Sequence, residues 1–457
     1  MLRLPVRLTP AGPRTTRLVA SALALQLTAA LGAVALVDRP SPRPGPEATA
    51  RARVAPAGEA QAQAQAVREQ QVRQLLAERG GALLRRDRSA FLASVDPAAQ
   101  DLRRRQAALF DALEEVPLGI WRYALDASSE RPPDTLLDRA YGRGRWWAPG
   151  VTLEYGLAGF DERPTVAVHH LTFVQRGGRW LLAADDDFAE VGLATPRALW
   201  DRGPVVTERV DDVLVLGRPS ARRLLRNVAT LTAAAVPRVD DVWGRDWRRG
   251  AVVVVPTSAG EMRELLGAGN DLSQIAAVAT AELTGSAGEF APTGDRIVVN
   301  PDTFSRLGQL GRRVVLTHEL THVATRRATG PAVPAWLAEG FADYIGYQGV
   351  DLPLGLSARE LQRDVREGRL PTVLPRDGDF DGGNASLAQA YEGSWLAVRL
   401  IAQQYGQDAL LRFYRRVGAQ RDLDAAEAVD RALRTELGTS TPALTRAWRD
   451  ALQRDLG

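Results

Sequence analysis

The sequence predicts an α+β protein with two folded units behind an N-terminal membrane segment. Helix-period apolar residues over positions 61–113 give way to short strand-like runs that end near residue 184, which predicts a first α+β unit. Short β-branched runs return between residues 204 and 300 and lead into a helix at 314–327. Beyond Tyr347 only helical periodicity remains, so we expect a helical C-terminal lobe after a small twisted sheet.

The first 37 residues have the charge pattern of a membrane signal. Residues 1–17 form a basic segment with four arginines and no acid, and residues 18–37 are uncharged and mostly apolar. Twenty helical residues span about 30 Å, the thickness of a bilayer's hydrocarbon. The arginines predict a single-pass anchor in the cell membrane with the rest of the chain extracytoplasmic. Ala33 and Ala35 also form a small-x-small cleavage site, so secretion after signal cleavage is the alternative.

Residues 38–59 are rich in proline, alanine and arginine, and we expect an extended linker. Residues 1–53 hold eight arginines and two acids, a net charge of +6, which leaves −3 for the rest of a chain whose total is +3. No basic stripe with interleaved aromatic residues appears, so nucleic acid is not expected as a partner. The absence of cysteine excludes disulfides and thiolate metal sites.

The first unit is expected over residues 60–195. Its helices are followed by strand-like runs, with Arg176-Gly177-Gly178 as a hairpin turn: 119–127, 151–157, 165–175 and 179–184. This order of elements resembles the nuclear transport factor two-like cone, a fold that binds small molecules, dimerises or forms enzymes. The resemblance rests on element order and on no diagnostic residue.

Polar and aromatic residues of this unit are expected to be structural. His169 and His170 are adjacent in a strand, so they point to opposite faces and cannot both bind one ion; we expect one packed and one exposed. The acids Asp185 to Asp187 are interpreted as a solvated loop rather than a calcium site. Four aromatic residues are expected in the core or at the lip of a pocket: Trp121, Tyr123, Trp146 and Trp147.

The second unit is expected over residues 200–457, and its first half alternates strands and helices. The predicted strands are 204–216, 251–255 and 297–300, and the predicted helices are 220–235 and 258–266. These elements describe a small sheet beside the helix at 314–327.

That helix carries the sequence THELTHVATR. His318 and His322 stand four residues apart, so they project from one face of a helix and are close enough to bind one metal ion. Glu319 follows the first histidine. Zinc held by neutral imidazoles keeps a position open for water, and a neighbouring carboxylate can take the water's proton, as in the H-E-x-x-H motif of metalloproteases.

A second helix, AWLAEGFADYIG, follows a Gly/Pro break and Pro334. Glu339 lies 17 positions beyond His322, where a returning helix presents a carboxylate as a candidate third ligand. Asp343, four residues later on the same face, is a candidate to orient a ligand histidine through its second nitrogen. With four histidines in 457 residues, a chance H-E-x-x-H is improbable. The longer metzincin pattern fails, because it needs glycine at Thr325 and histidine at Ala328.

At these residues the chain resembles the gluzincin metallopeptidases, the thermolysin-like superfamily, and in particular the peptidase MA-like group. The resemblance covers THELTHVATR, PAWLAEGFADYIG and the later AYEGSWLAVRLIAQQYG, and only loosely the residues between them. It implies one Zn²⁺ ion on His318, His322 and Glu339, with Glu319 as general base and Asp343 supporting a ligand. It also implies an edge strand that pairs with extended substrate, for which residues 276–280 and 297–300 are the candidates.

The chain departs from thermolysin in one respect. Thermolysin uses a histidine downstream of the zinc helix to stabilise the oxyanion, and no histidine follows His322 here. Other gluzincins use a tyrosine, so Tyr391 is the candidate oxyanion donor; packing at a helix start is the alternative role.

Four helices are predicted in the C-terminal lobe, at 387–405, 407–417, 425–437 and 442–456. A turn-rich acidic loop at 377–384 begins like a calcium loop but lacks a glutamate at its twelfth position, Ala388, so we expect a rim of the active site. The sequence thus predicts a membrane-anchored zinc peptidase acting on a peptide or protein substrate. The alternatives are an inactive binding or scaffold protein of this fold and a zinc hydrolase of non-peptide amides.

Overall fold

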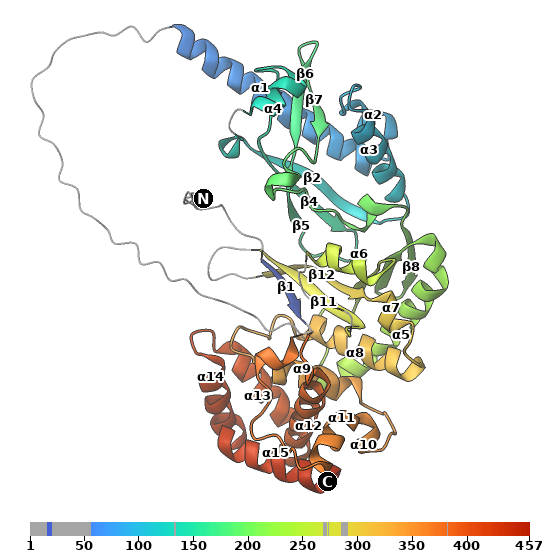
Figure 1. The fold of residues 1–457 in the computed structure, drawn as a ribbon, viewed down its shortest axis with the longest axis vertical. Coiled ribbons are helices and arrows are strands. Elements are labelled where there is room, and N and C mark those ends of the chain that lie inside the picture. Colours follow the sequence, from blue (N-terminus) through green and yellow to red (C-terminus); the bar gives the residue numbers. More distant parts are fainter. Residues whose placement is uncertain are drawn as a thin grey trace, which may run out of the picture.

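The computed structural model describes residues 16–20, 56–131, 134–267, 272, 274–284, 291–381 and 383–457. It is a mixed α+β protein with small sheets, as predicted. A first unit of helices and two small sheets lies at one end, a six-stranded sheet lies in the middle, and a helical lobe forms the other end (Figure 1).

The first unit begins with three helices and continues with a set of antiparallel strands. Its helices are α1 (Pro56–Leu84), α2 (Arg88–Ala93), α3 (Gln100–Ala112) and α4 (Thr135–Tyr141). Its strands are β2 (Leu118–Asp126), β3 (Trp146–Trp147), β4 (Gly150–Leu157), β5 (Thr165–His170), β6 (Thr172–Arg176) and β7 (Arg179–Ala184). They form two three-stranded sheets, in the orders β2-β4-β5 and β3-β6-β7.

One local prediction for this unit is wrong, and one feature of it was not predicted. The strand expected over 165–175 is divided at the buried Leu171, so that β5 pairs with β4 and β6 pairs with β7. The glycines at 80 and 81 do not interrupt α1. A Cβ atom at Gly80 would lie 2.7 Å from the carbonyl oxygen of Trp121, so this glycine allows α1 to lie close to β2.

The central sheet has the strand order β1-β11-β12-β10-β9-β8. Its strands are β1 (Thr16–Ala20), β8 (Val206–Val210), β9 (Val213–Gly217), β10 (Ala251–Val255), β11 (Ala277–Thr284) and β12 (Ala291–Val299). Strands β9, β10 and β12 are parallel, while β11 pairs antiparallel with β12 and β1 pairs antiparallel with β11. Of the two candidate edge strands, the stretch at 276–280 therefore lies near the edge and 297–300 lies inside the sheet.

A single strand was predicted over residues 204–216, and this prediction is wrong. The structure has the hairpin of β8 and β9 instead, which turns at Asp211 with a φ of +51°. Aspartate tolerates this left-handed conformation better than most residues, which lets Asp211 and Asp212 act as the turn.

The two faces of the central sheet are covered differently. Val215 and Val253 pack in one core with α5 (Arg222–Trp243) and α8 (Gln309–Thr325), the helix of the His-Glu-x-x-His motif. Their neighbours Leu216 and Val252 pack in a second core with Trp121 and other residues of the first unit. Because side chains alternate along a strand, the first unit and α8 lie on opposite faces of the sheet.

Short helices precede α8, and further helices build the C-terminal lobe. These are α6 (Ala259–Leu266), α7 (Pro301–Phe304), α9 (Ala335–Gly346), α10 (Leu354–Ser357), α11 (Arg359–Arg366), α12 (Leu387–Tyr405), α13 (Gln407–Ala419), α14 (Ala425–Ala432) and α15 (Thr441–Leu456). A π-helical turn at Leu433–Leu437 extends α14. The four long helices predicted after residue 387 are thus present, and their apolar faces form one core with α8 and α9.

The predicted anchor at residues 18–37 lies outside the described residues, except for its first three positions, which belong to β1. The basic segment at 1–17 and the linker at 38–59 are likewise outside them, apart from positions 16, 17 and 56–59. Within the described ranges, no helix combines the length and the apolar character needed to cross a bilayer.

Candidate metal centre

Helix α8 presents the two histidines of the motif to the same side. Leu316 and Leu320 are fully buried in the core shared with the sheet, which fixes the rotation of α8 about its axis. His318 and His322 are one turn apart on this helix, and both side chains are buried. Their imidazole rings are 4.7 Å apart at the centroids. The spacing therefore places both rings together, as predicted.

Helix α9 brings a carboxylate to the histidines. The Asp377 side chain accepts a hydrogen bond of 2.9 Å from the Ala335 N–H and so satisfies a free donor at the start of α9. Gly340, at the middle of α9, lies against the backbone of Ser394 in α12. A Cβ atom at position 340 would collide with the carbonyl oxygen of Ser394. Glu339 precedes this glycine and is buried, facing α8.

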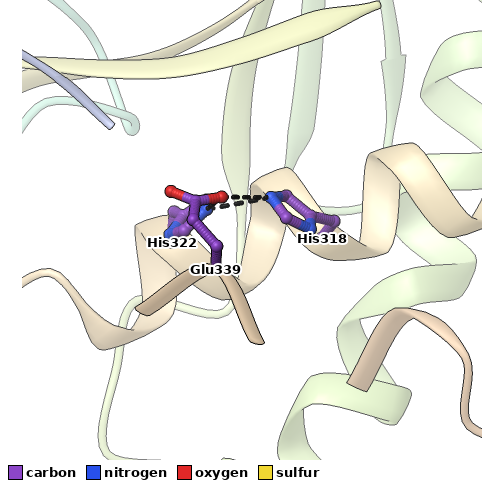
Figure 2. Close-up of side chains that lie close together, drawn as sticks. All are labelled: His318, His322 and Glu339. Atoms are coloured by element: carbon purple, nitrogen blue, oxygen red, sulfur yellow. Dashed lines mark hydrogen bonds and ion pairs between the residues drawn. The ribbon is translucent and has the colours of Figure 1, made fainter. Parts of the chain in front are cut away.

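Three ligand-type atoms converge between α8 and α9 (Figure 2). Nε2 of His318 lies 3.0 Å from Nε2 of His322 and 3.1 Å from Oε2 of Glu339. The third side of the triangle, from Nε2 of His322 to Oε2 of Glu339, is 3.3 Å. Two imidazole nitrogens and one carboxylate oxygen thus surround a single point.

The triangle fits zinc. Tetrahedral Zn²⁺ with ligands at about 2.0–2.1 Å requires ligand atoms about 3.3 Å apart, close to the three distances seen here. Asp343 lies 2.8 Å from Nδ1 of His318, so Nδ1 donates to this carboxylate and Nε2 keeps its lone pair for a metal. Burial opposes a charge on His318, but Asp343 and Glu339 raise the pKa of this imidazole well above its usual value, so the site favours a positive charge, which a proton or a metal ion can supply.

Buried charges shift the ionisation of this group in the protein alone. Burial disfavours the ionised form of Glu339, but the imidazoles of His322 and His318 outweigh it and hold the pKa of Glu339 well below its usual range. Glu339 is therefore a carboxylate at neutral pH. A carboxylate is the form in which this side chain binds a metal.

Glu319 is held by a hydrogen bond from the sheet and not by the three candidate metal ligands. Its Oε2 accepts a hydrogen bond of 2.7 Å from the backbone N–H of Ala279 in β11. The side chain is 3% exposed, and burial raises the pKa of Glu319 to about 8. A bound dication lowers the pKa of a neighbouring carboxyl group, so zinc favours the ionised form that accepts a proton.

Tyr391, on α12, borders the three converging side chains. Its ring centroid lies 6.1 Å from that of His318 and 5.3 Å from that of Phe380. Burial and the negative charge of Glu339 raise the pKa of Tyr391 well above its usual value, so its hydroxyl stays protonated and is available as a donor. Its role as an oxyanion donor remains a prediction.

Some expectations for residues outside the metal centre need revision. Asp185 is not solvated: it is 3% exposed and accepts hydrogen bonds from Arg105 and Arg197. His169 lines a cavity and His170 lies outside it, 3.5 Å from Arg131, but both are half-buried, so the expectation of one packed and one exposed histidine is wrong. The sequence also gave no sign that the Ala279 N–H would hold Glu319, since a backbone donor leaves no trace in residue types.

Comparison with known proteins finds matches among solved structures alone. No family model and no curated protein matches the chain. Solved M1 zinc metallopeptidases match it over part of its length. The enzyme from Deinococcus radiodurans has a TM-score of 0.31 and 16% identity, over 62% of this chain and 59% of that chain. A mutant of that enzyme bound to a Tyr-Ser-Ala substrate has a TM-score of 0.30 and 16% identity, over 60% and 58%.

A two-domain M1 zinc metallopeptidase mutant bound to L-arginine has a TM-score of 0.31 and 14% identity, over 61% of this chain and 58% of that chain. The chain thus matches about three fifths of the length of these solved structures. At these scores the similarity adds nothing about the chemistry of the site, which rests on the geometry of its residues.

Proposed function

We propose that this protein is a zinc-dependent peptidase that hydrolyses peptide bonds. The observation that carries the proposal is the convergence of His318, His322 and Glu339 at the separations that zinc requires. Glu319 lies next to this triangle in the same helix and is buried. Metal ligands, a carboxylate base and a tyrosine donor are together the parts that hydrolysis of an amide needs.

In this proposal His318, His322 and Glu339 hold the ion, and Asp343 keeps His318 in the tautomer that binds it. Bound zinc supplies Lewis acidity for the substrate carbonyl and lowers the pKa of water. The Glu319 carboxylate takes the proton of the attacking water and passes it to the leaving amine. The Tyr391 hydroxyl donates a hydrogen bond to the oxyanion.

Strand β11 is the proposed partner of an extended substrate. It lies next to Glu319, and its side away from β12 is the position where β1 pairs with it, antiparallel. The pairing of residues 16–20 with residues 279–283 supports the proposal that this edge accepts an extended peptide. A substrate at the same positions would have to replace β1.

The test is substitution of the base with retention of the metal. We expect Glu319→Gln to bind zinc as the wild type does and to lose at least about 1,000-fold in kcat on a peptide library. Glu427→Gln is the matched control, because Glu427 is exposed on α14 and pairs with the exposed Arg431. Hydrolysis by the Glu319→Gln protein at the wild-type rate would refute the assignment of the base.

The same assay separates the proposal from its two alternatives. A wild-type protein that binds zinc but cleaves no peptide in the library, and instead cleaves acyl amides that are not peptides, is the non-peptide hydrolase. A protein that cleaves neither is the inactive binding protein. Only peptide cleavage that depends on Glu319 supports a peptidase.

We also propose that residues 18–37 anchor the protein in the cell membrane with the folded units outside the cytoplasm. The support is the sequence alone: a long apolar run behind four arginines. Carbonate extraction of membranes and N-terminal sequencing of the mature chain test it. Residues 18–20 cannot lie both in a bilayer and in β1, so a chain released by carbonate with its N-terminus intact would refute the anchor.

A further inference from the structure

A cavity of about 150 Å³ lies between the first unit and the central sheet. The first unit contributes residues of β2, β4 and β5, and the segment at 195–201 closes the cavity. The sheet contributes Leu216, Val254 and Val298. Leu216 and Val254 pack with the first unit, on the face away from α8, so the cavity is separate from the metal centre.

One wall of the cavity is aromatic. The rings of Trp121, Tyr155 and Trp200 contact one another, with centroid separations of 6.1 Å, 6.3 Å and 5.3 Å. Trp121 donates its indole N–H to the hydroxyl of Tyr123, 3.1 Å away. Such a wall offers apolar ring faces and edges to a ligand.

The carboxylates of the cavity already accept hydrogen bonds from the protein. Asp185 accepts hydrogen bonds of 2.7 Å from Arg105, 2.8 Å from Arg197 and 3.3 Å from Gln106. Asp201 accepts one of 2.8 Å from the Ala198 N–H. A ligand therefore does not need a positive charge or several donors to enter this cavity.

Each of the groups without a partner can donate a hydrogen bond. Within the part of the chain that the structure describes, neither the His169 imidazole nor the Trp200 indole N–H makes a hydrogen bond, although both residues line the cavity. The hydroxyl of Thr165, another lining residue, is buried and has no partner. Buried polar groups are normally paired, as the Thr165 hydroxyl is not, and an acceptor inside the cavity would give Thr165, His169 and Trp200 a partner.

The charge around His169 also favours an acceptor. Burial and the nearby Arg197 lower the pKa of His169 to about 4, so the ring is neutral at pH 7 and carries one N–H donor. Arg197 uses Nη1 and Nη2 on Asp185 and has further N–H donors left. A negative group between His169 and Arg197 would thus be stabilised by both.

We propose that this cavity binds a small carboxylic acid with one aromatic ring or a short branched aliphatic body. The carboxylate accepts hydrogen bonds from His169, Trp200 and Arg197, and the body packs on Trp121 and Tyr155. The size agrees, because an apolar cavity of about 150 Å³ holds a benzene-sized molecule. This binding site is independent of the peptidase reaction proposed above.

Isothermal titration calorimetry of the full-length protein with sodium benzoate tests the proposal, with benzylamine as the probe of opposite charge. We expect benzoate to bind with a Kd of about 1 mM or lower, as ligand efficiencies of small molecules allow. His169→Phe is expected to weaken benzoate binding at least about tenfold by removing a donor. Ala167→Leu, which places carbon atoms into the cavity without touching a charge, is expected to weaken it similarly.

His170→Phe is the matched control, because this neighbour in β5 does not line the cavity. Near-UV circular dichroism establishes whether each variant is folded. If His169→Phe does not fold, the comparison of Ala167→Leu with the wild type provides the test. The proposal is supported if benzoate binds the wild type and His170→Phe equally and the cavity variants more weakly. Absence of benzoate binding, equal binding to all variants, or equal binding of benzylamine would overturn it.

Discussion

The metal centre and the cavity between the first unit and the central sheet differ in how the chain forms them. The metal centre takes its three ligand atoms from two consecutive helices, between His318 and Glu339. The cavity is lined by residues between Arg79 and Val298, which belong to helices and strands of both the first unit and the central sheet. A site whose residues share one local periodicity can be predicted from a motif, whereas a site assembled by topology cannot.

The two sites also differ in what their polar groups lack. At the metal centre, lone pairs and a carboxylate face one another and favour a cation. In the cavity, the carboxylates are paired and the unpaired groups of His169 and Trp200 are donors or neutral. The first arrangement suits a metal and the second an anion, so perturbing one should leave the other unchanged.

Removing zinc with a chelator should have the largest effect. Hydrolysis is expected to fall at least about 1,000-fold, because the activated water and the polarised carbonyl are both lost. Benzoate affinity at the cavity should change less than about twofold, since no cavity residue is a proposed ligand. Peptide hydrolysis and calorimetry on the same chelated sample measure both. Loss of benzoate binding together with the metal would show that the two sites are one functional unit.

Tyr391→Phe should have the next largest effect. If the hydroxyl stabilises the oxyanion, kcat falls by about 100- to 1,000-fold with zinc content unchanged. The phenylalanine keeps the packing against Phe380. Steady-state kinetics with metal analysis provide the measurement, and an unchanged kcat would leave Tyr391 a packing residue.

Asp343→Asn should weaken zinc binding without abolishing it. The aspartate holds Nδ1 of His318, and loss of such a partner typically costs about 10- to 100-fold in metal affinity. Asp351→Asn is the control, because this exposed residue follows α9 and contacts no ligand. Competition with a zinc-binding dye reports the affinity. Equal affinities of the two variants would contradict the orienting role of Asp343.

His169→Gln should have the smallest effect, on stability at acid pH. The native pKa of His169 is about 4 and the unfolded value is 6.5, so the unfolded state binds more protons between these values. The wild type therefore loses stability as pH falls from 6.5, by about 2 kcal/mol at pH 5.

Glutamine does not titrate, so the variant should lack this loss. Burial raises the pKa of Asp201 to about 6, so this residue increases the free energy of unfolding as the pH falls from about 6 to 4, opposite to His169. Asp201 is present in both proteins, so its contribution cancels in their difference. Urea unfolding at pH 7 and pH 5 gives the two free energies. The same pH dependence in both proteins would mean that the pKa of His169 is not lowered in the native state.

The long periodic segments were the predictable part of the fold. The helix Ala335–Gly346 and the four C-terminal helices follow from apolar spacing and Gly/Pro breaks, and so does the position of His318, His322 and Glu339. Strand pairing was less predictable. Leu171 continues an apolar run, and no residue in that run predicts that the chain passes from one sheet to the other at this position.

The unpredicted features depend on contacts between distant segments. Gly80 resembles a helix breaker, but its role is to let β2 approach α1. Asp185 resembles a solvated acid until Arg105 and Arg197 are placed beside it by the fold. The Ala279 amide that holds Glu319 belongs to a strand 40 residues away. Each of these roles is defined by a partner that local sequence does not contain.

The most direct test of the account is metal analysis of the purified protein beside its Glu339→Ala variant. We expect one zinc ion per chain in the wild type and a loss of most of that zinc in the variant, because the third ligand atom is removed from a triangle that already matches zinc geometry. A folded wild-type protein without zinc after incubation with the ion, or a variant that retains it with unchanged affinity, would contradict the account.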